Sequence, residues 1–330
     1  MPKALISSAK LQQLFAAIRG KPPRVAVIGD AMLDLYLRGD VDRISPEAPV
    51  PVVRVRERRY ALGGAANVAQ NVLAIGARCE LVAALGDDQP GAQLRELLVA
   101  QGAEPRGLIV AGRPTTTKTR VVARGQQVVR VDDEVDADLS GDEVKRLHAA
   151  VAAAIGDADA LILEDYNKGV LVPAVIERAI AAALKKKIPV VVDPKYRNFF
   201  AFQGATIFKP NRRELEAALG AAVDLDHPAA LPAVLARLGA AHLLLTLSEH
   251  GMALIDRSGA IHRIPTTARE VFDVVGAGDT VTAYLAVMLA AGATPLEAAV
   301  VANYAAGVEV GKAGAATVTP DEIVEAFDAH

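Results

Sequence analysis

The sequence is poor in features that mark secreted, membrane-spanning or nucleic-acid-binding proteins. Its single cysteine, Cys79, excludes an internal disulfide framework and fits a reducing compartment. A net charge of −3 with mixed signs argues against nucleic acid or an anionic membrane as the main partner. No stretch reaches the roughly 18 uninterrupted apolar residues of a membrane span, and the N-terminus lacks a signal-peptide pattern. We therefore expect a soluble, cytoplasmic protein.

Several common catalytic signatures are missing as well. The stretch nearest to a Gly-x-x-x-x-Gly-Lys-Ser/Thr phosphate loop, residues 307–313, is one residue short and lacks the hydroxyl. No dinucleotide fingerprint follows the first predicted strand, and Val281 stands where the later glycine pair would need a third glycine. The six histidines show neither metal-ligand spacing nor a nucleophile-elbow neighbour. These absences leave few classes of catalytic mechanism for this chain.

What is present is an alternation of strand and helix signals over 330 residues, 52% of them hydrophobic. Alternation of this kind predicts a mostly parallel sheet with helices on both faces. Ser140 and Glu143 have the spacing of a capping box at the start of one helix. The expected strands are 24–30, 80–85, 160–163, 189–193, 206–208, 243–247 and 252–255, and the expected helices are 91–101, 140–155, 173–186, one from 211, 276–291, 295–310 and one from 320.

Two pairs of segments differ in character from this core. Residues 35–42 and 50–57 form one pair, and in the second of these apolar Val53 and Val55 alternate with Arg54 and Arg56. Residues 115–123 and 127–131 form another pair with hairpin signals. We predict a small sheet apart from the main body, a lid or dimer surface. The chain is then a single domain, 1–330, with lid segments at about 35–57 and 113–132.

Polar residues follow several of the expected core strands. In parallel sheets such positions meet at one edge, where ligands gather. The acidic residues among them would repel a phosphorylated ligand unless a cation balances them, which makes Mg²⁺ a reasonable expectation. The residues are Asp30, Asp34, Asp87, Asp88, Glu164, Asp165, Asp193, Lys195, Asn211, Glu214, Ser248 and Glu249.

The most informative stretch is Asp273–Thr280, which precedes an apolar, Ala-rich helix. Gly276, Ala277 and Gly278 leave backbone N–H groups free to converge on an anion at the positive end of that helix. Asp279 is poorly placed to bind an anion but well placed to take a proton from an attacking hydroxyl. The pattern favours phosphoryl transfer to an alcohol. Taken alone, the same residues could also form a simple turn and helix cap.

Three further stretches allow both a structural and a functional interpretation. Paired Gly63 and Gly64 before Asn67 form either a tight turn or a close approach of the backbone to a sugar, whose hydroxyls Asn67 would reach. Asn211 and Glu214 have capping-box spacing, or lie near nucleotide phosphates and a metal-bound water. Residues 246–251 form a strand end and a polar turn.

Together these segments resemble the ribokinase, or PfkB, family of carbohydrate kinases, over nearly the whole chain. The resemblance implies a ribokinase-like three-layer α/β/α sandwich with a mostly parallel central sheet and a small β-sheet lid. It implies ATP and Mg²⁺ as cofactors, leaves open a monovalent cation, and suggests a homodimer formed through the lid sheet.

The resemblance also implies roles for individual residues. Asp279 would be the catalytic base, and Gly276, Ala277 and Gly278 the anion hole. The sugar phosphate would be held by Asp34, Arg43, Gly63, Gly64, Asn67, Arg120, Asp165, Lys168, Asp193 and Lys195, where the four basic residues are the candidates for its phosphate. The ATP site would comprise Asn211, Glu214, Thr246, Ser248, Gly251 and Asn303, with Glu214 reaching the metal through water.

Within the family, residues 43–51, 165–169 and 193–195 resemble the kinases of bacterial ADP-heptose synthesis. That subgroup phosphorylates the anomeric hydroxyl of D-glycero-D-manno-heptose 7-phosphate on the route to the lipopolysaccharide core. Because the chain ends at His330, we expect the stand-alone form of this kinase. The alternatives are a family kinase for another sugar, sugar phosphate or nucleoside, a non-catalytic sensor on the same fold and, more distantly, a dinucleotide-dependent oxidoreductase.

Overall fold

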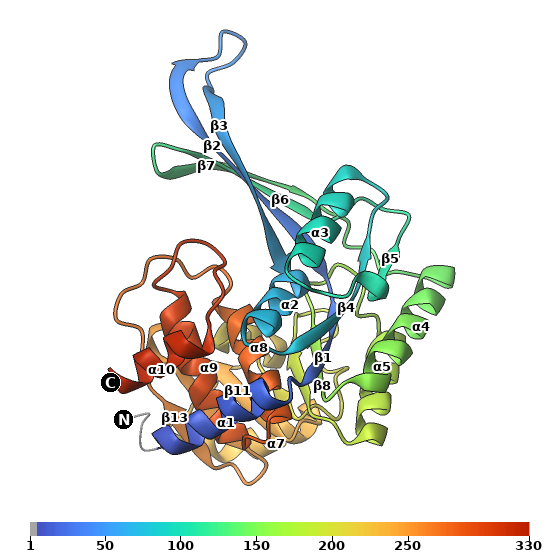
Figure 1. Cartoon of the computed structure of the whole chain (residues 1–330), viewed down its shortest axis with the longest axis vertical. Helices are drawn as coiled ribbons and strands as arrows, with labels where there is room; N and C mark the ends of the chain where they lie inside the picture. Colours follow the sequence, from blue (N-terminus) through green and yellow to red (C-terminus); the bar gives the residue numbers. More distant parts are fainter. Residues whose placement is uncertain (1–4, 330) are drawn as a thin grey trace.

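The computed structural model describes residues 5–329, so the ends of the predicted single domain, residues 1–4 and 330, lie outside the described part. Its centre is a nine-stranded sheet with the order β13-β12-β11-β10-β9-β8-β1-β4-β5 (Figure 1). Neighbouring strands run parallel except at β11/β12 and β12/β13. The mostly parallel sheet is confirmed. The strands are β1 (Arg24–Gly29), β4 (Arg78–Leu85), β5 (Leu108–Val110), β8 (Ala160–Glu164), β9 (Val190–Asp193), β10 (Ile207–Phe208), β11 (His242–Thr246), β12 (Met252–Asp256) and β13 (Ile261–Ile264).

Helices cover both faces of this sheet. In β1, Val25 and Val27 join one hydrophobic core and Ala26 and Ile28 join another, because successive side chains of a strand point to opposite faces. Figure 1 shows α4 and α5 on one side of the sheet and α1, α9 and α10 on the other. The predicted three-layer α/β/α sandwich is confirmed. No helix within residues 5–329 is both long and apolar enough to span a membrane.

The two helical layers follow from the membership of the two cores. The first core takes side chains from α1 (Ser8–Gly20), α2 (Ala65–Ala74), α3 (Gln89–Ala100), α8 (Ala277–Ala290), α9 (Pro295–Glu309) and α10 (Pro320–Asp328). The second takes them from α4 (Gly141–Asp157), α5 (Pro173–Lys186), α6 (Arg212–Leu219) and α7 (Leu231–Leu238). Short 3₁₀ turns connect other elements: η2 (Pro105–Gly107), η3 (Pro228–Ala230) and η4 (Ser248–His250).

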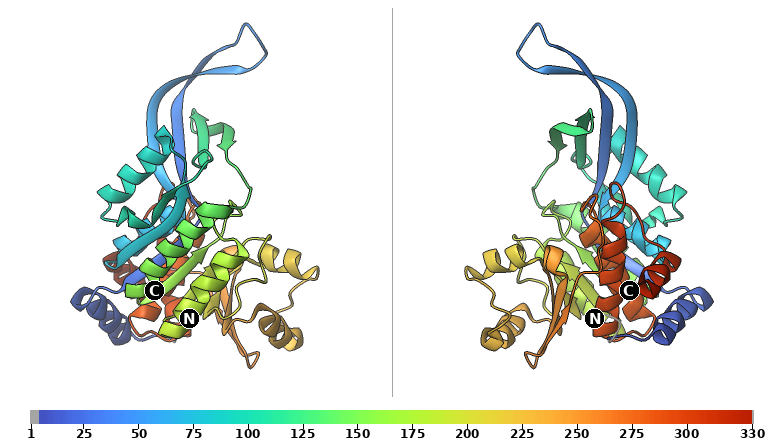
Figure 2. Two further views of the ribbon diagram at one scale, coloured as in Figure 1. Left: turned by 90° about the vertical axis from the view of Figure 1, so that its right-hand side faces the viewer. Right: turned by 90° about the vertical axis from the view of Figure 1, so that its left-hand side faces the viewer.

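A second, four-stranded sheet with the order β3-β2-β6-β7 rises from the body, and Figure 2 shows its long hairpin standing clear in both side views. Its strands are β2 (Ala31–Ile44), β3 (Pro51–Gly64), β6 (Thr117–Ala123) and β7 (Gln126–Asp133). β2 and β3 pair antiparallel, β6 adds parallel to β2, and β7 pairs antiparallel with β6. The small sheet is confirmed, but β2 and β3 are longer than the predicted 35–42 and 50–57. Their inner ends are buried and therefore lack the polar–apolar alternation that marks their outer parts.

The predicted capping box at Ser140 is wrong. Ser140 is the N-cap of α4, but its side chain accepts no hydrogen bond there. The carboxylate of Glu143 instead accepts the backbone N–H of Gly112 at 2.9 Å, so a loop outside the helix takes the group that would complete the box. The box at Asn211 and Glu214 does form, with both reciprocal hydrogen bonds present.

The order of the strands fixes where a ligand can bind. The chain leaves β1 for β4 on one side, while β8 lies on the other, so strand order reverses at β1. Ligands of open α/β sheets bind at the carboxyl ends of the strands beside such a reversal. Asp30 follows β1, Glu164 ends β8 and Asp193 ends β9 at this edge.

Candidate functional site

The carboxylate of Asp279 lies at the centre of this edge, in the first turn of α8. It is buried, and each of its oxygens accepts one hydrogen bond. The Nδ2 of Asn67 donates to Oδ2 at 2.7 Å, and the hydroxyl of Tyr166 donates to Oδ1 at 2.9 Å. Both donors come from elements far away in the sequence, so the fold itself orients this group.

The environment of Asp279 suits a proton acceptor. Burial raises its pKa to about 6, although the hydrogen bonds from Asn67 and Tyr166 pull in the opposite direction. A carboxylate with this pKa is ionised at neutral pH yet more basic than an exposed aspartate. Such tuning is typical of general bases.

Two pockets meet at the segment Val275–Asp279. A pocket of about 370 Å³ is lined by Ala277 and Gly278, and a second of about 190 Å³ is lined by Gly276 and Asp279. The backbone at the start of α8 thus separates the two cavities and borders both. A group held by these amides could pass from a molecule in one pocket to a molecule in the other.

The first pocket gathers most of the residues predicted for a nucleotide. Thr246, Ser248, Gly251 and Asn303 line it together with apolar Val274 and Val281. Asn303 donates to the backbone oxygen of Pro265 at 2.9 Å and so fixes the loop at the rim. These residues supply polar groups on an apolar wall, as small-molecule sites require.

Asn211 and Glu214 lie beside this pocket rather than in its wall. Asn211 lines an adjoining groove together with Thr246 and Ser248. Glu214 accepts from the backbone N–H of Asn211 at 2.9 Å and forms an ion pair with Lys195. Both of its oxygens are therefore engaged, and a metal-bound water would compete with Lys195 for them.

The second pocket gathers most of the residues predicted for a sugar. Asp34, Gly63, Gly64, Asn67 and Arg120 line it. Asp34 accepts a hydrogen bond from Arg120 at 2.7 Å. A Cβ on Gly63 would lie 2.7 Å from Cγ of Met32, so a larger residue here would have to displace the Met32 side chain. The predicted close approach of this backbone to a sugar stays a prediction.

Three polar residues of this pocket could not be predicted from the sequence. Lys118, Arg130 and Tyr166 all line it. Lys118 and Arg130 resemble ordinary surface residues of two-faced strands, and only the register of the lid sheet brings them to the pocket. Tyr166 follows Asp165 in a motif that was noted, but no spacing rule connects it with Asp279.

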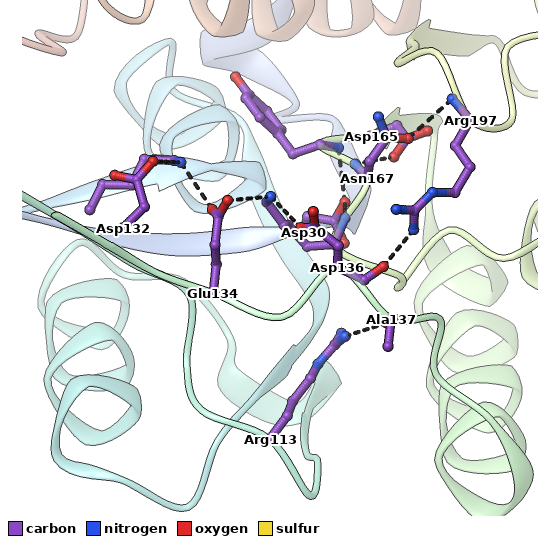
Figure 3. A network of polar contacts seen from close by, with 12 residues as sticks. Asp30, Arg113, Asp132, Glu134, Asp136, Ala137, Asp165, Asn167 and Arg197 are labelled. Carbon is purple, nitrogen blue, oxygen red and sulfur yellow. Dashed lines mark hydrogen bonds and ion pairs between the residues drawn. The ribbon is translucent and has the colours of Figure 1, made fainter. Parts of the chain in front are cut away.

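Two of the four basic residues predicted to bind the substrate phosphate, Lys168 and Lys195, form ion pairs away from the sugar pocket. A third, Arg43, lies on the lid hairpin. Lys168 pairs with Glu134 at 2.8 Å and Asp136 at 2.5 Å, within the acidic chain of contacts that Figure 3 follows from Asp132 to Arg197. Lys195 pairs with Glu214. Arg43 is exposed at the outer end of β2, where the hairpin turns (Figure 1).

The predicted residues Asp165 and Asp193 differ in their surroundings. Asp165 is buried and accepts the backbone N–H of Asn167 at 2.7 Å, which shapes the loop after β8. Burial raises its pKa to about 7. Asp193 forms a buried ion pair with Lys209 at 2.7 Å. Lys209 was also missed, because a lysine that directly follows a short strand carries no signal of burial.

A cluster of carboxylates could hold a metal ion. One oxygen each of Glu164, Asp193 and Asp279 lie within 4.8 Å of one another, and all three residues are buried. Neither carboxyl oxygen of Glu164 has a hydrogen-bond partner among residues 5–329. Burial, then the charges of Asp193 and Asp279, raise the pKa of Glu164 well above its usual range. Oxygen ligands with an unmet need for positive charge fit Mg²⁺.

The chain matches a known protein family over most of its length. Residues 22–322 match the family model described as pfkB family carbohydrate kinase. The bifunctional protein HldE of Pelobacter propionicus is 47% identical over 319 residues, which cover 96% of this chain and 65% of that protein. HldE of Gluconacetobacter diazotrophicus is 47% identical over 309 residues, covering 93% and 64%. The chain thus spans slightly less than two thirds of the length of these curated relatives.

Solved structures share the fold at lower sequence identity. A ribokinase from Thermotoga maritima has a TM-score of 0.72 at 23% identity, with 93% of this chain and 99% of that chain covered. An Arabidopsis thaliana ribokinase, complexed with ribose and ATP, gives 0.72 at 20% identity and the same coverage. Phosphofructokinase-2 from Escherichia coli, in complex with potassium, gives 0.74 at 19% identity, again with 93% and 99% covered.

The hydrogen bond from Tyr166 to Asp279 can be tested without any substrate. In Tyr166→Phe, Asp279 loses one donor to its charged form, so its pKa should rise from about 6 by roughly one unit. Carboxyl ¹³C chemical shifts followed against pH measure this. Tyr196→Phe, at an exposed tyrosine, is the matched control and should leave the pKa unchanged. An equal or lower pKa of Asp279 in Tyr166→Phe would contradict the assignment.

Proposed function

Because the chain belongs to the pfkB family of carbohydrate kinases, we propose that it phosphorylates the anomeric hydroxyl of D-glycero-β-D-manno-heptose 7-phosphate with ATP. The product would be the 1,7-bisphosphate used in ADP-heptose and lipopolysaccharide core synthesis. The observation that supports a kinase reaction at this site is the position of the segment Val275–Asp279, which borders both pockets and ends in a buried carboxylate.

In the proposed reaction, the residues of that segment have different roles. Asp279 takes the proton from the sugar hydroxyl as its oxygen attacks the γ-phosphorus of ATP, and the bond from that phosphorus to the bridging oxygen of ADP breaks. The backbone amides of Gly276, Ala277 and Gly278, at the positive end of α8, bind the phosphoryl group in transit. Phosphoryl transfer depends chiefly on such alignment and charge stabilisation. A positioned base contributes about 10²–10⁴-fold.

ATP would occupy the 370 Å³ pocket, with its phosphates towards Gly278. Lys209 and Lys195 lie on the acidic side of the site, where Asp193 raises the pKa of both against the effect of burial. Both lysines are therefore charged at neutral pH and can offset the phosphate charge. Asn303 and Thr246 remain the candidates for polar contacts to the nucleoside.

Mg²⁺ would be held by Glu164 and Asp193, and its charge would neutralise the phosphate oxygens of ATP. Glu164 is the better ligand of the site, because its two oxygens have no partner among the described residues. The predicted water-mediated role of Glu214 stays a proposal, and it would require Lys195 to release that carboxylate.

Two observations support a heptose phosphate as the substrate. Residues 43–51, 165–169 and 193–195 resemble the subgroup that uses this sugar, and two HldE proteins are 47% identical to the chain. The sugar pocket also carries Lys118, Arg120 and Arg130, which suit an anionic substrate.

The substrate assignment is tested by ATP turnover across a panel of sugars. We expect kcat/KM for heptose 7-phosphate to exceed that for ribose and fructose by at least about tenfold, since a site built for a charged group rejects ligands that lack it. A plain sugar used far better than the heptose phosphate would replace the substrate. Absence of turnover with every sugar would favour a non-catalytic sensor.

We also propose a homodimer formed through the lid sheet. β7 exposes Val129 and Val131, which are 47% and 55% accessible and lie on the same face of the strand. Exposed apolar residues that gather on one face of a sheet are typical of a surface that another protein covers.

The dimer is tested by light scattering at micromolar concentration. Val131→Lys should convert a dimer of the wild type to a monomer, because a desolvated charge would then lie in the interface. Val99→Lys, at a valine on α3 that is 52% exposed, is the matched control and should stay dimeric. A monomeric wild type would contradict the proposal.

A further inference from the structure

We propose that Arg130 and Lys118 bind the phosphate that the sugar substrate already carries, at the lid end of the 190 Å³ pocket. This inference rests on the proposed kinase function and assigns the recognition of a phosphorylated sugar to residues outside the family motifs quoted above. The pocket is lined by Asp279 at one end of its wall and by the strands of the lid sheet at the other. One ligand can therefore present a hydroxyl to Asp279 and a phosphate to the lid.

The register of the lid sheet concentrates positive charge on the face that borders the pocket. Arg120 on β6 and Arg130 on β7 are direct cross-strand partners. Like charges placed opposite each other destabilise a sheet unless anions separate them. Lys118 lies two residues before Arg120 and therefore on the same face. All three line the pocket, where the facing carboxylates are Asp34 and Asp279.

The side chain of Arg120 already has partners within the protein. Its guanidinium donates to Asp34 at 2.7 Å, and it lies over the ring of Tyr36 with 5.2 Å to the centroid. Both side chains of the ion pair are largely buried. Moving Arg120 onto a ligand would leave the carboxylate of Asp34 buried without a partner, which is costly. Arg120 therefore shapes the wall and holds Asp34 towards the sugar.

Arg130 can be recruited at low cost. Its Nε and Nη2 donate to the two oxygens of Asp132 at 2.9 and 3.0 Å, two residues away on the same strand. The arginine side chain is 52% exposed, and exposed ion pairs of this kind contribute little to stability. A phosphate dianion offers the same two-pronged geometry with more charge. Exchange of Asp132 for the phosphate is thus favourable.

Lys118 supplies the second contact. Its ammonium lies 3.2 Å from Asp132 and 3.1 Å from Glu134, and the side chain is mostly buried. Lys118 also lines the wall of the pocket. If Arg130 releases Asp132, the Lys118 ammonium can still donate to that carboxylate while it donates to the phosphate, because it has three N–H donors. The arrangement can therefore accept a phosphate without leaving an isolated buried charge.

The competing explanation is that Arg130 and Lys118 only stabilise the lid through Asp132. The two explanations differ in what a charge-removing substitution changes. Loss of a phosphate ligand weakens binding of phosphorylated sugars alone. Loss of a structural ion pair affects phosphorylated and plain sugars alike, together with thermal stability.

The experiment compares Arg130→Gln and Lys118→Gln with Arg56→Gln. Arg56 forms an equivalent exposed pair with Asp40 at 2.9 Å in the outer lid hairpin, which makes it the matched control. KM and kcat are measured for heptose 7-phosphate, for the same heptose without its phosphate, and for ATP. In each pocket variant KM for the phosphorylated sugar should rise about 10- to 100-fold, as expected for lost charge-assisted hydrogen bonds. The other constants should stay within about twofold, and Arg56→Gln should match the wild type.

Calorimetric titration of the wild type and Arg130→Gln with a panel of sugar phosphates, without ATP, separates this inference from the proposed function. Weaker binding of another sugar phosphate by the variant supports the inference even if heptose 7-phosphate is not the substrate. Equal affinity in both proteins, or equal losses for plain and phosphorylated sugars, overturns the inference and leaves the kinase function intact. A wild type that binds no sugar phosphate overturns the inference and the substrate assignment together.

Discussion

The site depends on one constraint: a carboxylate must remain ionised inside the protein, beside other carboxylates, without collapsing the fold. Asp279 meets it because both of its oxygens accept hydrogen bonds from groups that are themselves fixed, Asn67 and Tyr166. Burial opposes its ionisation and the two donors favour it. Lys209, paired with Asp193 and itself buried, offsets part of the negative charge nearby. Without these partners the same burial would leave Asp279 protonated and unable to act as a base.

Other parts of the fold hold those partners in place. Asp30, buried at the end of β1, accepts backbone N–H groups from Tyr166, Lys168 and Val170 and so shapes the loop that carries the Tyr166 hydroxyl. Gly64 brings the end of the lid sheet against the backbone of Asp30, since a Cβ there would lie 2.4 Å from its oxygen. The base, the loop after β8 and the root of the lid are therefore one connected unit. A ligand that moves the lid would act on the same residues that orient the base.

The sequence allowed a good prediction of the layers and of Asp279, because those depend on local signals: alternating hydrophobic segments and a glycine turn before an apolar helix. It could not identify Arg130, Lys118, Tyr166 or Lys209, since their roles depend on which strands lie side by side. It misassigned Glu143 because a capping box is a local pattern, whereas the N–H of Gly112 reaches that carboxylate from another element. Arg43 was nominated for its motif, yet the length of β2 carries it to the outer end of the lid hairpin.

The most direct test of this account is Asp279→Asn, compared with Asp321→Asn at an exposed aspartate of α10. We expect kcat of Asp279→Asn to fall by about 10²–10⁴ while its Kd for ATP stays unchanged. Because folding raises the pKa of Asp279 from 3.8 to about 6, its ionisation destabilises the fold as the pH rises through this range, and the full cost persists above it. The variant should therefore melt no lower than the wild type at pH 8. Near-normal turnover in a folded Asp279→Asn would contradict the assignment of the base and, with it, the proposed mechanism.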